Sequence, residues 1–383
     1  MKIFLVDLES VSTRYTSEWK THLPEILKNI KGCEVHIIAG SDDIPEATTP
    51  GAFLNFGGTN IYKAGQVEEM GRLFCSGQVR AGDHFFFADA WHPGIINLKY
   101  MSELLNISVV THGMWHAGSY DPQDFLGRGI SNKIWVSHAE KSFFHAFDHN
   151  YFATQFHINM FCENLLDTTE EKIKLHYGNK IVRSGWPMNY LSKIFEPYDK
   201  SNKRDLILFP HRIAPEKQID IFRDLQKQLP QYELVICQEQ TLTKEEYHKL
   251  LCESKMVFSA NLQETLGISC YEATLADSIP VVPDRLSYSE MYHEEFKYPS
   301  TWTRNFECYL SHREQLCEFI KNRMENYESY FKWHVRYPSI PKDKMGDDIV
   351  YAPPVSSSIN LLAQQRWKLE KDFFTATNLL FSK

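Results

Sequence analysis

Short runs of hydrophobic residues alternate with segments of helical periodicity along most of the chain. In the first half, the hydrophobic runs fall at residues 2–7, 34–40, 83–89, 108–113, 133–138 and 180–185. Between them, residues 61–74 and 95–105 place hydrophobic side chains at spacings of three and four, which is typical of amphipathic helices. Alternation of short buried strands with helices predicts βα units and a parallel sheet covered on both faces.

A polar stretch at residues 196–205 interrupts this pattern and predicts a linker between two domains. Beyond it, hydrophobic runs alternate again with helical segments at 218–229 and 243–254; these runs fall at 206–210, 232–237, 255–260 and 279–283. We therefore predict an α/β chain of two doubly wound domains, residues 1–195 and 205–340, that face each other across a cleft. Residues 358–383 predict an amphipathic C-terminal helix that packs back toward the N-terminal domain.

The composition limits the classes of function. The 383 residues are 43% hydrophobic and 14% aromatic, which is enough to bury a core in each of two domains. A formal charge of −8 without a long run of one sign argues against a globally basic nucleic-acid-binding protein, although a local basic groove stays open. The eight cysteines are scattered singly with no Cys-x-x-Cys pair, so a zinc site has little support.

The expected location is the cytoplasm, with no membrane partner. The opening residues MKIFLVD become acidic at Asp7 and predict a β-strand, not a signal peptide. No hydrophobic run reaches the roughly 18 residues that a transmembrane helix needs. We therefore expect a reducing compartment and reduced, buried cysteines.

Two loops of the second domain carry candidate chemistry, because ligands of open parallel sheets bind beyond the carboxyl ends of the strands. The first loop, FPHRIAPEK, presents Arg212 and Lys217 after the predicted strand at 206–210. The planar guanidinium and the mobile ammonium group suit a diphosphate. When this loop is taken alone, a solvated loop with an ordinary arginine and lysine is an equally good alternative.

The second loop, NLQETLGISCYE, places Glu264 before a predicted helix and Glu272 two turns inside it. Backbone N–H groups at a helix start attract phosphate oxygens, and Gly267 allows close approach. A carboxylate in an otherwise apolar helix needs partners, and the two hydroxyls of a ribose would satisfy Glu272. The alternatives are a favourable charge near a helix N-terminus for Glu264 and a partly exposed helix edge for Glu272.

The combination of Arg212, Lys217, Glu264 and Glu272, followed by ADSIPVVPD, resembles the nucleotide-sugar domain of family 4 retaining glycosyltransferases of the GT-B fold, over about residues 205–290. The PHR run and the YSEM sequence also resemble the tRNA-queuosine mannosyltransferase branch. More loosely, the whole chain, with LVDLESVSTRYTSEWKTHLP and HGMWHAGSYDPQDFLGRG, resembles uncharacterised glycosyltransferases of T4-like bacteriophages. Relatives of that kind attach glucose or arabinose to 5-hydroxymethylcytosine in phage DNA.

The resemblance implies roles for the residues of the two loops. Arg212 and Lys217 would hold the diphosphate of a UDP-sugar donor and stabilise its charge as the glycosidic bond breaks. Glu272 would bind the nucleotide ribose, and Glu264 would bind hydroxyls of the donor sugar. No metal cofactor is implied, because the two cations supply the positive charge, and the chain has no Asp-x-Asp motif.

The resemblance also assigns backbone and histidine contacts to the donor. The backbone of Thr265, Leu266 and Gly267 would lie beside the sugar and the phosphates. His112, after the strand predicted at 108–111, matches the position where the family places a histidine near the donor sugar.

Polar and aromatic residues after two strands of the first domain are the acceptor candidates. FADAWHPG places Asp89 and Trp91 after one strand, and HGMWHAGSYD places Trp115, His116 and Asp121 after another. Bases stack on tryptophan and are read by histidine or aspartate, so these loops suit a flat acceptor. For any single one of these residues, packing with satisfied polar atoms is the more common role.

Two further features of the first half concern the acceptor. The loop LESVSTRYTSEW has no glycine where family members usually carry glycines, so Glu9, Ser10, Ser12, Thr13 and Arg14 depart from the family pattern. Residues 172–204 hold cations that could contact DNA phosphates, although a solvated surface is the commoner role for such charges. These cations are Lys172, Lys174, Lys180, Arg183, Lys193, Lys200, Lys203 and Arg204.

The sequence as a whole predicts a metal-independent retaining glycosyltransferase. It would move a sugar, glucose or arabinose by resemblance, from a UDP-sugar to 5-hydroxymethylcytosine in double-stranded phage DNA. The alternatives are transfer to tRNA queuosine or to a glycan, a sugar-nucleotide epimerase of a related two-domain fold, and a non-catalytic sensor of nucleotide sugars. The donor sugar, the nucleobase and the oligomeric state stay open.

Overall fold

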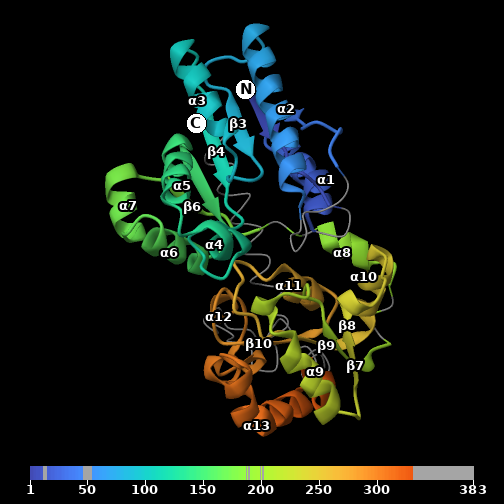
Figure 1. The fold of residues 1–383 in the computed structure, drawn as a ribbon. Helices are drawn as coiled ribbons and strands as arrows, with labels where there is room; N and C mark the ends of the chain where they lie inside the picture. Colours follow the sequence, from blue (N-terminus) through green and yellow to red (C-terminus); the bar gives the residue numbers. More distant parts are fainter. Residues whose placement is uncertain are drawn as a thin grey trace, which may run out of the picture. The chain divides into compact units, whose positions relative to one another are not determined.

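The computed structural model describes residues 1–11, 15–45, 54–186, 188, 190–198, 200 and 202–330. The chain forms two α/β units, and the division between them falls after Trp186 (Figure 1). The short helix α8 (Tyr190–Phe195) belongs to the second unit, because it packs against α10 (Lys244–Glu253) and α11 (Ile268–Leu275). The polar stretch 196–205 therefore lies inside the second unit and does not separate the two.

The first unit is built on a six-stranded parallel sheet with the strand order β2-β1-β3-β4-β5-β6. The strands are β1 (Lys2–Val6), β2 (Glu34–Ile38), β3 (His84–Phe87), β4 (Val110–Met114), β5 (His149–Phe152) and β6 (Ile181–Arg183). Strand β1 pairs with β2 on one side and with β3 on the other, so that Phe4 lies opposite both His36 and Phe85. The central strands are buried on both faces, which explains their near-continuous hydrophobic sequences.

Seven helices of the first unit lie in its described residues. They are α1 (Tyr15–Lys28), α2 (Phe56–Cys75), α3 (Gly94–Leu104), α4 (Phe125–Ile130), α5 (Ile134–Ala146), α6 (Gln155–Asn164) and α7 (Glu170–Tyr177). Side chains cap several helix starts: Asn55 accepts a hydrogen bond from the Gly58 amide, and Thr154 accepts one from the His157 amide. Helices α2, α3 and α5 pack side by side (Figure 1).

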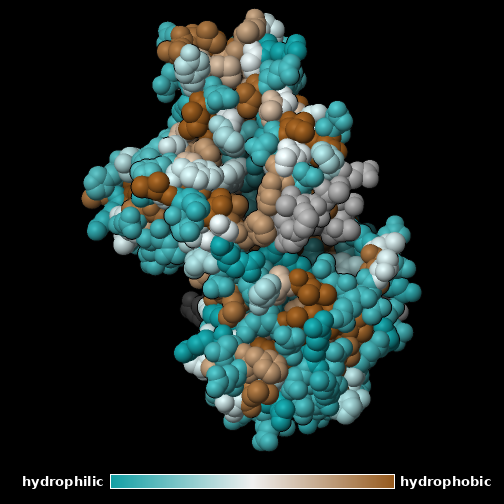
Figure 2. Space-filling view, in the orientation of Figure 1, coloured by the Kyte–Doolittle hydropathy of each residue, from teal (hydrophilic) through white to brown (hydrophobic). Residues whose placement is uncertain are grey.

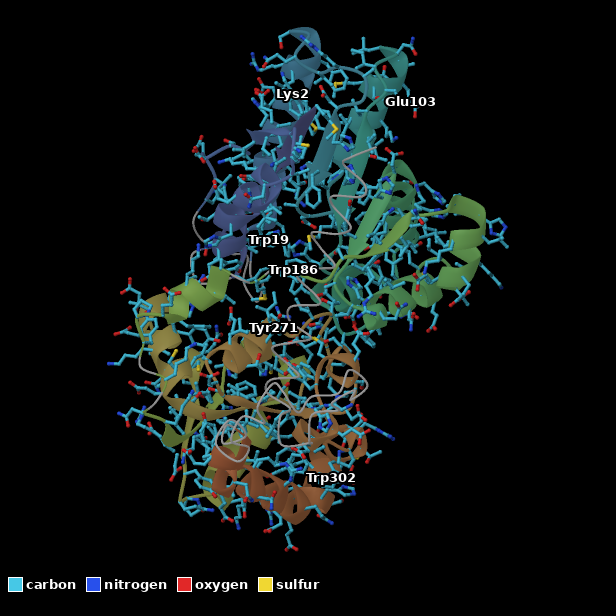
Figure 3. All side chains as sticks on the ribbon, turned by 180° about the vertical axis from the view of Figure 1, so that it is seen from behind. Lys2, Trp19, Glu103, Trp186, Tyr271 and Trp302 are labelled. Carbon is cyan, nitrogen blue, oxygen red and sulfur yellow. The ribbon has the colours of Figure 1, made fainter. Side chains whose placement is uncertain are left out.

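Aromatic side chains fill much of the first unit's core. Phe85, Phe86 and Phe87 on β3 are fully buried. Trp19 on α1 stacks on Trp186 with ring centroids 4.7 Å apart, as Figure 3 shows from behind. This contact fixes the end of the unit against its first helix, because both rings are almost inaccessible to solvent.

The second unit contains a five-stranded parallel sheet with the order β11-β10-β9-β7-β8. Its strands are β7 (Arg204–Phe209), β8 (Glu233–Ile236), β9 (Ser254–Phe258), β10 (Ile279–Pro283) and β11 (Lys297–Tyr298). Its longer helices, besides α10 and α11, are α9 (Ile219–Gln228) and α13 (Phe306–Glu325), with α12 (Tyr288–Met291) as a single turn. Short 3-10 turns occur at Pro215–Lys217, Cys237–Glu239, Glu294–Phe296, Ser300–Thr303 and Tyr327–Tyr330.

One predicted strand forms a helix in the structure, and one strand of the first unit was not predicted. Residues 133–138 were expected as a strand but form the start of α5, with Ile134 77% exposed and Trp135 55% exposed. Strand β5 escaped prediction because it is short and carries His149 and Asn150, whose polarity hides a buried strand. The predicted C-terminal helix at 358–383 lies outside the described residues.

The surface is hydrophilic over most of the face drawn in Figure 2, with hydrophobic residues in scattered patches. Within the described ranges, we find no helix that combines the length and the hydrophobicity required to cross a membrane.

A buried carboxylate on α5 holds two loops of the first unit. Glu140 is fully buried and accepts hydrogen bonds from Trp91 Nε1 (2.9 Å), the Ser119 amide (2.7 Å) and Ser119 Oγ (2.6 Å).

Glu140→Ala leaves these three donors without their acceptor, so we expect the free energy of unfolding to fall by about 3 kcal/mol in urea denaturation. Glu163→Ala, at an exposed position on α6, is the matched control, and an equal loss in both variants would contradict this account.

Candidate functional site

The site candidates of the second unit gather at the point where the strand order of its sheet reverses. Strand β8 lies on one side of β7 and β9 lies on the other, so the chain leaves β7 and β9 in opposite directions. In open parallel sheets, ligands bind at the carboxyl ends of such a strand pair. Arg212 and Lys217 follow β7, and Glu264 follows β9, so all three lie at this position.

Lys217 and Glu264 form an ion pair that joins the loops after β7 and β9. Lys217 Nζ lies 2.7 Å from Glu264 Oε1 and also donates to the backbone oxygen of Gln263 at 2.7 Å. The side chain of Lys217 is 6% exposed and that of Glu264 is 16% exposed, so water screens the pair only weakly. The structure thus brings two predicted site residues into direct contact.

Arg212 lies on the same loop as Lys217 and is held by a buried carboxylate. Arg212 Nη2 lies 2.5 Å from Glu216 Oε1, and the Glu216 side chain is fully buried. The Glu216 backbone oxygen accepts a hydrogen bond of 2.8 Å from the Leu262 amide, which ties this loop to the one after β9. The contact with Glu216 orients the guanidinium of Arg212. The Arg212 side chain is 33% exposed, so it still reaches solvent.

The carboxylate of Glu264 is anchored through one oxygen. Oε1 accepts hydrogen bonds from Lys217 Nζ and from Asn261 Nδ2, both at 2.7 Å. For Oε2, no hydrogen-bond partner is found within the described part of the chain. A carboxylate held in this way presents a second, partly exposed acceptor in a fixed direction, which suits recognition of a hydroxyl group.

Gly267 begins α11 in a left-handed conformation, with φ 74° and ψ 51°. A Cβ at this position would lie 2.5 Å from Tyr288 Cε1, so the tyrosine ring packs directly against the backbone. Leu266 is 4% exposed and points into the core. The predicted backbone contacts of Thr265, Leu266 and Gly267 therefore belong to the start of a helix whose N–H groups are typical anion partners.

Glu272 lies in the second turn of α11 and is 6% exposed, so the alternative of a partly exposed helix edge is wrong. Its Oε2 accepts a hydrogen bond of 3.1 Å from the hydroxyl of Tyr247 on α10. Burial, and then the charge of Glu272, hold the pKa of Tyr247 well above its usual value. The phenol therefore stays a donor to the carboxylate at neutral pH.

The sequence analysis missed the residues that connect these loops. Asn261 is fully buried, and its Nδ2 lies 3.0 Å from the Tyr288 hydroxyl and 3.3 Å from His211 Nδ1. Arg285 donates from Nε to the Asn261 backbone oxygen and from Nη2 to the Ala260 backbone oxygen, each at 2.7 Å. The polar Asn261 directly after a hydrophobic strand was the one signal that the sequence offered.

His211 is the first side chain after β7 to contact this network. It is 3% exposed and lies 3.2 Å from Ser269 Oγ on α11. Burial, and then the charge of Lys217, hold the pKa of His211 well below its usual value, so the ring is neutral. It therefore contributes hydrogen bonds and no charge to the site.

Three predicted acceptor residues of the first unit lie near the carboxyl ends of β3 and β4; they are Asp89, Trp91 and His116. Asp89 Oδ2 lies 3.3 Å from Lys63 Nζ, and the Asp89 side chain is 32% exposed. Burial alone would raise the pKa of Asp89, but Lys63, His116 and the Trp91 amide outweigh it and lower the pKa. His116 bonds through Nδ1 to the Tyr15 hydroxyl at 2.8 Å and through Nε2 to the Ala88 oxygen at 2.7 Å.

The two other predicted acceptor residues, Trp115 and Asp121, are buried inside the first unit. Trp115 is 1% exposed, stacks on Phe152 and donates from Nε1 to Asn150 Oδ1 at 2.8 Å. Asp121 is 5% exposed and accepts a hydrogen bond from the Gln123 amide. Neither presents a surface on which an acceptor base could stack or bind.

The position of His112 differs from the one expected after a strand at 108–111. It lies inside β4, not after it, and is fully buried. Its Nε2 lies 2.8 Å from His84 Nδ1 and its Nδ1 lies 3.0 Å from the Tyr151 hydroxyl. Burial holds its pKa well below the usual value. The histidine that follows the strand end is His116.

The glycine-free loop after β1 is described only in part, and the basic segment at 172–204 largely contacts the protein itself. Glu9 accepts a hydrogen bond of 2.6 Å from Thr59 Oγ1, while Ser12, Thr13 and Arg14 lie outside the described residues. Many cations of residues 172–204 already bind protein acceptors. These pairs are Lys174 with Glu170, Lys180 with the Phe147 oxygen, Lys200 with the Leu275 oxygen, Lys203 with the Ser254 oxygen, and Arg204 with Glu233.

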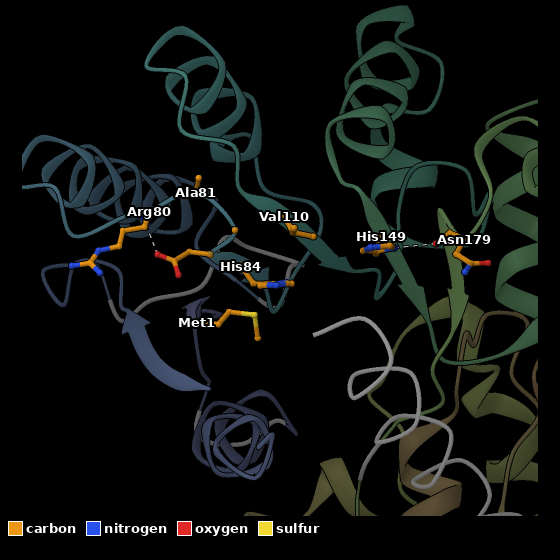
Figure 4. A pocket seen from close by; sticks show the side chains of 9 residues that line it. Met1, Arg80, Ala81, His84, Val110, His149 and Asn179 are labelled. Carbon is orange, nitrogen blue, oxygen red and sulfur yellow. Dashed lines mark hydrogen bonds between the residues drawn. The ribbon is translucent and has the colours of Figure 1, made fainter. Parts of the chain in front are cut away.

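Metal-ligating side chains, cysteines and a surface hollow are further features of the described residues. No group of three or more His, Cys, Asp or Glu side chains that could hold a metal ion occurs among them. All eight cysteines are free. A hollow of about 510 Å³ lies beside Arg80, Asp83, His84 and His149, at the amino ends of β3, β4 and β5 (Figure 4). Within the first unit, that is the end of the strands opposite to Asp89 and His116.

Comparison with known proteins shows the fold. No protein-family model matches the chain, and no curated protein matches it. HepE of Anabaena, solved in complex with UDP and glucose, is 12% identical, with a TM-score of 0.53 over 100% of both chains. The catalytic domain of starch synthase IV from Arabidopsis thaliana, bound to ADP and acarbose, is 10% identical, with a TM-score of 0.51 over 98% of this chain and 99% of that chain.

A third structure is the pneumococcal O-GlcNAc transferase GtfA, in complex with UDP and GlcNAc. It is 13% identical over 81% of this chain, with a TM-score of 0.48, and the chain spans 60% of its length. At these identities, structural likeness establishes the fold. The predicted fold class is confirmed: the chain has the two parallel-sheet, Rossmann-like units of the GT-B fold.

The contact between Gly267 and Tyr288 can be tested with one substitution. Gly267→Ala places a Cβ against the Tyr288 ring and forces alanine to a positive φ, so we expect the free energy of unfolding to fall by about 1–3 kcal/mol in urea denaturation. Gly129→Ala on α4 is the matched control, because a Cβ there meets no atom within 4 Å. Equal stability of the two variants would contradict the close packing of this helix start on the tyrosine ring.

Proposed function

We propose that this chain is a retaining glycosyltransferase that moves a sugar from a UDP-sugar to a hydroxyl acceptor. The observation that carries the proposal is the joining of Lys217, Asn261 and Glu264 where the second unit's strand order reverses, with Arg212 on the adjoining loop. The fold is compatible with such a ligand, because HepE of the same fold holds UDP and glucose.

The two cations would bind the diphosphate of the donor. Arg212 offers a partly exposed planar fork oriented by Glu216, and Lys217 offers an ammonium group between Glu264 and the diphosphate. As the bond between the sugar C1 and the phosphate oxygen breaks, its electron pair passes to the departing diphosphate. Positive groups fixed in a poorly hydrated loop stabilise this developing charge strongly. The reaction then requires no metal ion, since these residues supply the charge.

The two carboxylates would bind the sugars on either side of the diphosphate. Glu264, with Oε1 anchored, accepts a hydrogen bond from a donor-sugar hydroxyl at Oε2. Glu272 accepts ribose hydroxyls beside its bond from Tyr247. Hydroxyl groups are suitable partners for both residues, because an ionised carboxylate only accepts hydrogen bonds.

Retention follows from attack on the face that the leaving group vacates. The acceptor oxygen bonds to C1 on the same side from which the diphosphate departs, and the acceptor proton passes to the departing phosphate oxygen. No protein base is needed, so catalysis consists of charge stabilisation and positioning.

The acceptor that we propose, 5-hydroxymethylcytosine in DNA, rests on sequence resemblance. Asp89, Trp91 and His116 support a polar, partly exposed acceptor edge in the first unit. The intramolecular partners of the cations in residues 172–204 weigh against an extended phosphate contact there. Transfer to a glycan or to tRNA queuosine would use the same donor half.

Variants of the donor site should separate binding from chemistry. We expect Arg212→Ala to weaken UDP binding roughly 10–100-fold, because it removes charge-assisted hydrogen bonds to phosphate. Glu264→Gln should lower kcat about 100-fold, since Glu264 faces the sugar. Calorimetry with UDP and a transfer assay give the two constants. The matched surface controls are Arg72→Ala and Glu68→Gln, and if they behave like the site variants, the assignment is wrong.

An acceptor screen with mass detection tests the reaction itself. UDP-glucose, UDP-GlcNAc and UDP-arabinose are each incubated with DNA that contains 5-hydroxymethylcytosine, with queuosine tRNA and with oligosaccharides. We expect one nucleotide sugar to add a glycosyl mass to the modified cytosine. Transfer to a glycan alone would exclude the DNA acceptor, isomerisation of a UDP-sugar without acceptor would indicate an epimerase, and binding without turnover would indicate a sensor.

A further inference from the structure

Asn261 lies beneath Glu264 at the centre of a buried hydrogen-bond cluster. It directly follows the end of the hydrophobic run that contains β9 and is fully buried. Nδ2 lies 2.7 Å from Glu264 Oε1 and 3.0 Å from the Tyr288 hydroxyl, which in turn lies 3.1 Å from Ser259 Oγ. The backbone oxygen of Asn261 accepts from Arg285 Nε at 2.7 Å, so both ends of the residue are fixed.

The orientation of this amide is determined by Glu264. An ionised carboxylate only accepts hydrogen bonds, so the NH₂ group, and not the oxygen, of Asn261 must face Oε1. The cost of this orientation is visible at Oδ1, which is buried and has no hydrogen-bond partner among the described residues. The hydrogen bond from Nδ2 to Glu264 therefore determines the orientation of the amide, although this orientation leaves Oδ1 unsatisfied.

Lys217, the other donor to Glu264, is shared among several hydrogen-bond acceptors. Its ammonium group has three N–H donors and faces three protein acceptors, Gln263 O, Gln263 Oε1 and Glu264 Oε1, at 2.7, 3.5 and 2.7 Å. A bound diphosphate draws the same ammonium group and weakens its bond to Glu264. The bond from Asn261 is then the remaining fixed anchor, because a neutral amide is attracted much less to phosphate.

We propose that Asn261 is a positioning residue that holds Oε1 of Glu264, so that Oε2 faces the donor sugar while Lys217 turns to the diphosphate. This inference rests on the proposed function and adds a residue that acts through Glu264. If Asn261 acts through Glu264, a charge introduced at position 261 should change activity although the residue does not contact the substrate.

Replacing the amide by a carboxylate provides a pH-dependent test. Asn261→Asp places two carboxylates beside each other, and such pairs keep one proton to higher pH than either group alone. With that proton, the introduced carboxyl group would still donate to Glu264; without it, like charges would push Glu264 away. The ratio of variant to wild-type activity should therefore be highest at low pH and fall as the pH rises.

The other titratable groups around the pair do not mimic this dependence. Burial keeps His211 neutral by lowering its pKa, and it keeps Cys270, Tyr288 and Tyr292 neutral by raising theirs. Lys217 and Arg285 are the cations that face the pair. All of these groups are present in the wild-type chain as well, so their contribution cancels in the ratio. They are His211 and Lys217 after β7, Cys270 on α11, Arg285 after β10, Tyr288 on α12 and Tyr292 after α12.

The experiment measures kcat and KM for turnover of the UDP-sugar between pH 6 and pH 9 in the full chain. We expect the activity ratio of Asn261→Asp to wild type to fall about tenfold or more across this range, with the Kd for UDP changed less than about threefold. Asn132→Asp, at an exposed position of the first unit, is the matched control and should give a constant ratio. A constant ratio for Asn261→Asp would overturn the inference.

Two further outcomes separate this inference from the proposal beneath it. A wild-type chain that turns over no UDP-sugar would overturn the proposed function and this inference with it. If Asn261→Asp does not fold, Asn261→Ala decides: a fall in kcat of about tenfold with an unchanged Kd for UDP supports the positioning role. Loss of UDP binding in folded Asn261→Ala, equal to its loss of activity, would show that the residue merely supports the loop.

Discussion

The ion pair between Lys217 and Glu264 joins two loops that are far apart in sequence and leave adjacent strands of the second unit. Each charge is largely shielded from water, so each would be costly without the other. The pair is stable because further groups complete it: the Gln263 oxygen on the lysine and the Asn261 amide on the glutamate. Arg212 lies on the same loop as Lys217, and α11 begins shortly after Glu264 in the sequence.

Two unusual backbone conformations lie close in sequence to this contact. Gln218 is left-handed with φ 53°, and its side chain donates to the Ala260 and Thr303 oxygens, which joins the loop after β7 to the end of β9. Gly267 is left-handed with φ 74° and packs on Tyr288. Such conformations cost free energy and are kept where surrounding contacts impose them, as at ligand-binding loops. The backbone beside the ion pair is thus held in these conformations by contacts within the second unit.

Much of the fold could be predicted, because buried parallel strands such as Leu206–Phe209 are continuous hydrophobic runs between amphipathic helices. The placement of Lys217 and Glu264 at the carboxyl ends of the strands could be predicted, because ligand-binding loops of open parallel sheets lie there. Their direct contact depends on the pairing of β7 with β9, which the hydrophobic pattern does not reveal. The supporting residues could not be found in this way: Asn261, Tyr288 and Arg285 meet only through the particular path of three loops. Pattern reasoning failed where polarity and burial disagree, as at buried Trp115 and His112 or at exposed Ile134.

The most direct test of this account is a crystal structure of the chain with UDP bound. The account predicts that the diphosphate contacts Arg212 and Lys217, that the ribose hydroxyls reach Glu272, and that Asn261 still donates to Glu264. A UDP molecule bound away from the carboxyl ends of β7 and β9, or a Glu264 side chain turned away from Asn261 and Lys217, would contradict it.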